Sequence, residues 1–178
     1  MSLAPALALL LVAPAAPQPT QVDAARQGLM EGCVPHTIAG RTIARKNAAQ
    51  LRAAGIEVDA SIPDWVRTGN KEWGASVPAE IASVEGPVWI SAFQHGVCTL
   101  IFTSGERQSA NAEALRRMIE ASGSGFTKVG ETRIADRISR LYNSPLKPSG
   151  TLRLTFSATT EAAPKGGEII AVSTSRFD

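Results

Sequence analysis

The segment 151–158 alternates strictly between apolar and polar side chains, and no other pattern in the chain constrains the fold as strongly. Its apolar members are Leu152, Leu154, Phe156 and Ala158. A period of two is typical of a strand with one buried and one hydrated face, as in an antiparallel sheet covered on one side. The segment 168–177 follows after a loop that contains Pro164, and we predict that it forms the neighbouring antiparallel strand.

Two further runs, 88–93 and 97–103, are rich in β-branched and aromatic residues and are separated only by Gln-His-Gly. This pattern predicts a β-hairpin whose two strands are both buried. The segment 133–142 is ambiguous, because its apolar residues fit one face of a helix, whereas its place before a Pro/Gly-containing loop and two clear strands favours a strand. We predict a strand there.

The chain before these strands has helical spacing in two places. A capping-box pattern at 20–23 begins a first helix, which we expect to run from 22 to about 32. Pro35 should prevent its continuation, because proline lacks an N–H and clashes with the preceding turn. A second helical pattern runs through Ala44, Ala48 and Leu51 and is predicted to end where Gly55 can adopt a left-handed conformation.

One more helix is predicted at 109–122, with Gly123 as its end, whereas 56–84 is interrupted by Pro and Gly and is expected to be rich in loops. A chain of 178 residues with 44% hydrophobic residues can build one core. We therefore predict an α+β fold, with an N-terminal helical pair and one further helix packed on an antiparallel sheet of about four to five strands.

The first residues predict export. An uncharged, alanine-rich stretch contains an apolar run that is shorter than the about 20 residues of a membrane-spanning helix and is typical of a signal peptide. Ala13 and Ala15 supply the small residues needed before a cleavage site. We predict a signal peptide at 1–15, a linker at 16–21 and a single α+β domain at 22–178. The mature protein is expected to be periplasmic or secreted, with no membrane span after cleavage.

The only two cysteines and the only two histidines form a C-x2-H pair, Cys33 and His36, and an H-x2-C pair, His95 and Cys98. In an oxidising compartment the two cysteines can form a disulfide that stabilises the fold by about 4 kcal/mol, and this is our prediction. The same four side chains could instead bind zinc tetrahedrally, and the sequence leaves that alternative open. His95 could activate Cys98 as a nucleophile only if a bulge turned both to the same face of the strand.

Other candidate sites are weaker. The unusual arginine cluster at 133–140 has nearby acidic partners and only one aromatic residue, so neither it nor the net charge of +2 favours nucleic-acid binding. Trp65 and Trp73 lie in the loop-rich segment and are the candidates for ligand contact, whereas Trp89 is expected in the core. Carboxylates for glycoside cleavage could come from Glu72, Glu80, Glu85, Glu106 and Glu113.

These observations predict a small, exported, non-catalytic domain that is stabilised by a Cys33–Cys98 disulfide and binds a partner protein, an envelope component or a small ligand. No cofactor or metal is expected. The alternative is an envelope hydrolase that uses carboxylates or a Cys/His zinc site.

Overall fold

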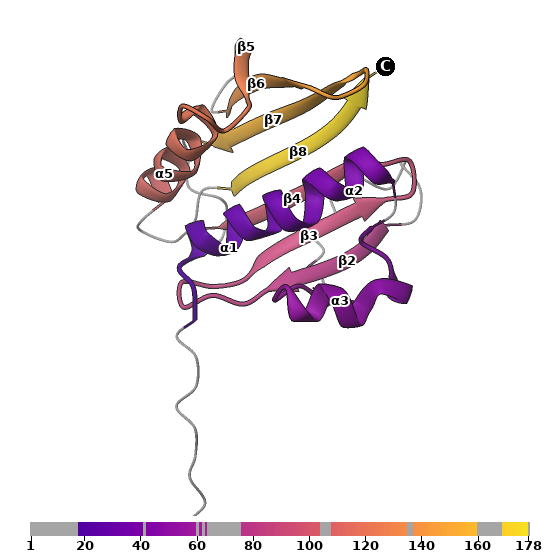
Figure 1. Cartoon of the computed structure of the whole chain (residues 1–178). Coiled ribbons are helices and arrows are strands. Elements are labelled where there is room, and N and C mark those ends of the chain that lie inside the picture. The colour runs from indigo at the N-terminus through magenta and orange to yellow at the C-terminus, as the bar shows by residue number, and fades with distance from the viewer. Residues whose placement is uncertain are drawn as a thin grey trace, which may run out of the picture.

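A computed structural model describes most of the chain as one antiparallel sheet covered on one face by helices (Figure 1). The described residues are 18–40, 42–59, 61, 63, 76–103, 108–134, 137–159 and 169–177. The eight strands are β1 Glu57–Val58, β2 Ser76–Ile81, β3 Val88–Phe93, β4 Cys98–Thr103, β5 Thr127–Ile134, β6 Arg137–Pro145, β7 Thr151–Thr159 and β8 Ile169–Phe177. Their order across the sheet is β1-β2-β3-β4-β8-β7-β6-β5.

The helices come before each group of four strands. Three consecutive elements, α1 Gln21–Gln27, the π-helical η1 Gly28–Cys33 and α2 Val34–Ala39, form one continuous helix that crosses in front of β3 and β4 (Figure 1). The short α3 Ala48–Ala53 follows the 3-10 turn η2 Arg45–Asn47, and α5 Gln108–Glu120 precedes the second group of strands.

The molecule is therefore built from two similar halves. In each half a helix is followed by a four-stranded antiparallel meander, β1 to β4 in the first half and β5 to β8 in the second. The fourth strands of the two meanders pair with each other, with Leu100 opposite Val172. This pairing of β4 with β8 is the seam that joins the halves into one sheet.

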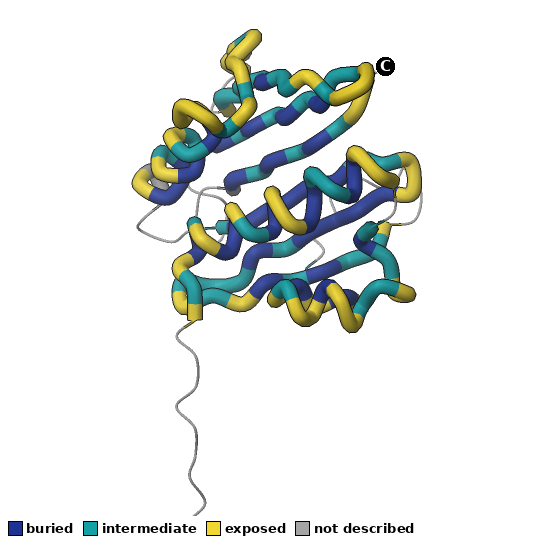
Figure 2. The backbone as a smooth tube through the Cα atoms, in the orientation of Figure 1, coloured by how far each residue is buried: buried dark blue, intermediate teal, exposed yellow. Residues whose placement is uncertain are grey.

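The core lies between the helices and one face of the sheet. Alternate residues of each central strand are buried there, including Ile90, Leu100, Val172 and Phe156, as the dark blue strands of Figure 2 show. Two glycines bring the continuous helix close to the sheet. A Cβ atom at Gly28 would lie 2.7 Å from Leu100 Cδ1, so any larger residue there would force the Leu100 side chain to shift.

The helix does not end at Pro35, so that prediction is wrong. In η1 the hydrogen bonding shifts by one residue, and the N–H of Val34 donates to the carbonyl of Leu29, five residues back. A π turn is wider than an α turn and relaxes the clash between a proline ring and the carbonyl before it. The helix consequently continues past Pro35 as far as Ala39.

The α+β class is confirmed, but the predicted strand number of four to five is too low, because the sheet has eight strands. Two additional strands, β1 and β2, lie in the segment expected to be loops, and β5 was also not predicted. The strand predicted at 133–142 is confirmed by β6 and the end of β5. The predicted hairpin, the helix at 109–122 and the strands at 151–158 and 168–177 correspond to β3 and β4, α5, β7 and β8.

Candidate functional site

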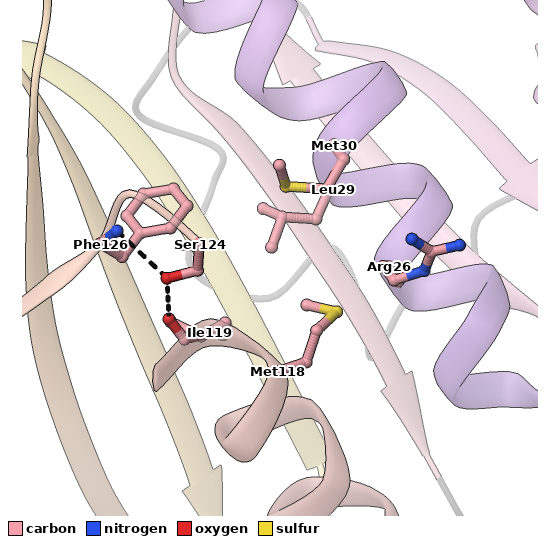
Figure 3. A pocket seen from close by; sticks show the side chains of 7 residues that line it. All are labelled: Arg26, Leu29, Met30, Met118, Ile119, Ser124 and Phe126. Atoms are coloured by element: carbon pink, nitrogen blue, oxygen red, sulfur yellow. Dashed lines mark hydrogen bonds between the residues drawn. The ribbon is translucent and has the colours of Figure 1, made fainter. Parts of the chain in front are cut away.

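A half-open apolar groove lies where the helix of the first half meets the second half (Figure 3). It has a volume of about 130 Å³ and is lined by Arg26, Leu29, Met30, Met118, Ile119, Ser124 and Phe126. Figure 3 shows the side chains of Leu29 and Met30 on one wall and those of Met118 and Phe126 on the other, facing the same space. Leu29 and Ile119 are buried, whereas Met30 is 43% exposed.

The turn after α5 places Phe126 in the groove. Gly123 and Gly125 both have positive φ angles, of 89° and 82°, which let the chain reverse within a few residues. Between them, the Ser124 hydroxyl donates to the carbonyl of Ile119 at 2.7 Å and accepts the N–H of Phe126 at 3.2 Å. The one hydroxyl in the groove wall therefore has its partners within the protein and stabilises the turn.

The polar side chains of α5 form a separate cluster. Glu113 accepts hydrogen bonds from Arg116 and Arg117, which lower the pKa of this carboxyl to about 2. Arg116 also contacts Glu120, whose Oε1 accepts the hydroxyl of Tyr142 at 2.7 Å. Burial and this hydrogen bond raise the pKa of Tyr142 above its ordinary value of 10. These groups attach α5 to the sheet.

The Cys33–Cys98 disulfide is present and lies in the core. Its sulfurs are 1.95 Å apart and its Cα atoms 5.2 Å apart, and both residues are fully buried. It connects η1 to the first residue of β4. Zinc binding by the Cys/His set is wrong, because the two sulfurs are bonded to each other, and Cys98 has no free thiol to act as a nucleophile.

His36 is a structural residue. Its Nε2 lies 2.9 Å from the carbonyl oxygen of Phe93, and its Nδ1 accepts the N–H of Ile43 at 3.2 Å. The imidazole is therefore neutral, with its proton on Nε2. Desolvation lowers the pKa of His36 below 6.5, despite the opposing effect of the bond to Phe93. A second hollow of about 220 Å³ lies beside this histidine and is also lined by Val77 and Gln94.

The remaining predicted site residues do not converge. Trp65, Trp73, Glu72 and Glu106 lie outside the described residues, so their roles stay predictions. Glu85 accepts hydrogen bonds from the N–H of Gln21 and from Asn111, and Glu80 lies on β2. Nowhere in the described parts of the chain do three or more His, Cys, Asp or Glu side chains gather as a metal would require. Trp89 lies on the sheet face away from the helices, where it packs with Ile101 and Ala171.

No helix among the described residues is both long and apolar enough to cross a membrane. The predicted export signal at 1–15 lies outside the described residues.

Sequence reasoning did not identify the groove. The two predicted helices at 22–32 and 109–122 contain Leu29, Met118 and Ile119, but helical spacing cannot show that the two helices meet. The signal that was available is the position of the methionines, because the sequence has only Met1, Met30 and Met118, and the last two lie in the groove.

Comparison of the chain with protein families, with curated proteins and with solved structures found no match.

Proposed function

We propose that this protein is an exported, non-catalytic domain that binds a partner through the groove between η1 and α5. One observation carries the proposal: in the described part of the chain the side chains suited to chemistry hold the fold together, while an apolar groove stays open to solvent. His36 bonds to two backbone groups, both cysteines form the disulfide, and Glu113 and Glu120 pair with arginines.

The disulfide supports export. Protein disulfides form and persist in oxidising compartments such as the periplasm or the extracellular space, and are rare in the cytosol. Here the bond is buried between the long helix and β4, so its formation belongs to folding. The signal-peptide pattern at 1–15 supports the same location independently.

The methionines support binding. A methionine side chain is unbranched and polarizable, so a surface lined by methionines adapts to apolar groups of different shape. Met30 is the exposed apolar residue of the groove, and Met118 faces it from α5 (Figure 3). An apolar group that binds between Met30 and Met118 would remove their thioether groups from contact with water.

Intact mass spectrometry of protein expressed from its own start codon in a Gram-negative host tests export. We expect the periplasmic fraction to contain a chain that lacks residues 1–15 and gains two hydrogen masses on reduction. An uncleaved, fully reduced chain in the cytosol would overturn this part of the proposal.

Labelling with methyl-¹³C methionine tests binding. The mature chain has only two methionines, so its methyl spectrum should contain two signals, from Met30 and Met118. Met30→Leu and Met118→Leu assign them. We expect both signals to shift when a blocked peptide with a central leucine is added, and unchanged signals at millimolar peptide would contradict a role of the groove in binding.

A further inference from the structure

We infer that the groove selects an acidic peptide segment of a partner protein, with one large apolar side chain inserted between Met30 and Met118 and a carboxylate beside it paired with Arg26. This inference rests on the proposed function and specifies the chemistry of the partner.

The size of the groove fits one side chain. Its volume of about 130 Å³ is close to the ~150 Å³ of an apolar cavity that accepts a benzene ring. It is well below the ~300–1,000 Å³ of typical small-molecule sites, and a lipid chain of a dozen methylenes would extend outside it. A leucine, methionine or phenylalanine side chain of a docked peptide fills such a space.

The charge at the rim gives the second requirement. Arg26 lies one helical turn before Met30 and lines the groove, and its side chain is exposed. Within the described residues it takes part in no ion pair or side-chain hydrogen bond. The neighbouring arginines of α5, by contrast, are paired with Glu113 and Glu120.

The nearest acid on the same helix does not neutralise this cation. Asp23 interacts instead with Thr20, whose hydroxyl lies 2.6 Å from Asp23 Oδ2 and also accepts the Asp23 N–H. Because Ser124 is satisfied by backbone groups, Arg26 is the polar group of the groove that can bond to a ligand. A guanidinium with no partner favours a carboxylate, with which it forms charge-assisted hydrogen bonds.

The test uses the methyl-labelled mature protein and three blocked peptides, Ac-Gly-Glu-Leu-Glu-Gly-NH₂ and its versions with Gln or Lys in place of both Glu. We expect the acidic peptide to shift the Met30 and Met118 signals at the lowest concentration. The Gln peptide should bind up to about fivefold more weakly, the upper end for one exposed ion pair, and the Lys peptide more weakly still.

Arg26→Gln should remove the preference for the acidic peptide, so that the acidic and Gln peptides bind with similar affinity. Arg52→Gln on α3, which removes the same charge from a residue that does not line the groove, is the matched control and should keep the preference. The methyl spectra of both variants without peptide show whether the groove is intact.

Equal binding of all three peptides would overturn the inference but would still agree with binding in the groove. No shift with any peptide would contradict both the inference and the proposed function. Sodium decanoate is the final arm. If it shifts both methyl signals where the peptides do not, the occupant is a lipid-like amphiphile, and the assignment to a peptide is wrong.

Discussion

The two halves of the molecule repeat one arrangement but differ in how much of the sheet is covered. In the first half a continuous helix from 21 to 39 lies across strands of six residues, and β3 and β4 are almost entirely buried. In the second half the 13-residue α5 faces strands of eight or nine residues. β5 is consequently exposed along nearly its whole length, with Ile134 72% exposed.

Helix coverage and strand composition both contribute to this difference. β5 has only Val129 and Ile134 as large apolar residues, whereas β3 reads VWISAF. In addition, no helix among the described residues reaches the outer end of the β5–β6 hairpin (Figure 1). The exposed edge instead carries Lys128, Glu131 and a β-bulge between Lys128 and Gly130. Charges and bulges on an edge strand discourage pairing with other chains.

The largest effect is expected when the covalent link of the first half is removed. The double variant Cys33→Ala/Cys98→Ala should lose about 2–5 kcal/mol of unfolding free energy, as is usual for a native disulfide. Urea unfolding followed by circular dichroism measures it. The wild-type protein unfolded with reductant is the control and should lose a similar amount. A loss below about 1 kcal/mol would show that packing alone holds the helix on β4.

The next largest loss of stability is expected when the close packing of the long helix against the sheet is disturbed. In Gly28→Ala the added methyl overlaps with Leu100 in a packed core, which costs about 1–3 kcal/mol. Alanine gains about 1 kcal/mol over glycine in a helix, so we expect a net loss of stability of up to about 2 kcal/mol.

Gly32→Ala is the graded control for that packing. Its added methyl would lie 3.3 Å from Ile56 Cδ1, so the loss should be clearly smaller. Thermal unfolding of both variants gives the comparison. If Gly28→Ala is as stable as the wild type, the helix does not need the close approach.

The first half should also be sensitive to acid. The folded-state pKa of His36 lies below 6.5, so the unfolded chain binds the proton more readily. The stability from neutral His36 is therefore fully present above about pH 6.5 and is lost as the pH falls below it. His36→Gln keeps a donor for the Phe93 carbonyl but does not titrate.

Urea midpoints measured from pH 7.5 to 5 test this dependence. The wild type should lose stability over that range, and His36→Gln should lose less. Parallel curves for the two proteins would exclude His36 as the group responsible.

The second half should be sensitive to alkali, and more weakly. The folded-state pKa of Tyr142 lies above 10, so its contribution to stability is fully present below pH 10 and is lost as the pH rises above it. Tyr142→Phe should cost about 1 kcal/mol at neutral pH, the usual value for one hydrogen bond. It should also remove part of the decline seen above pH 10. An unchanged alkaline profile would assign that decline to another group.

The regular parts of this fold were predictable because local pattern determines them. The alternation at 151–158 predicts β7, the buried runs predict β3 and β4, and the capping pattern predicts the start of α1, where Thr20 accepts the N–H of Asp23. The disulfide was also predictable, since only two cysteines were available.

The errors arose where long-range packing decides the structure. Pro35 ends a regular helix, but not one that is widened by a π turn, and nothing local indicates that turn. β1 has only two residues and is a strand because β2 pairs with it. The groove could not be predicted, because Met30 and Met118 are 88 positions apart and meet only after the halves dock.

The seam between β4 and β8 has a consequence for the order of folding. β8 is the last strand in the chain, yet it lies in the middle of the sheet, between β4 and β7. β4 of the first meander therefore gains its partner β8 only when residues 169–177 have been synthesised and are free to pair. Strand pairings between segments so far apart in the sequence form slowly. A polypeptide that threads through a secretion channel from its N-terminus would stay loosely structured during passage and close into its final form on the far side.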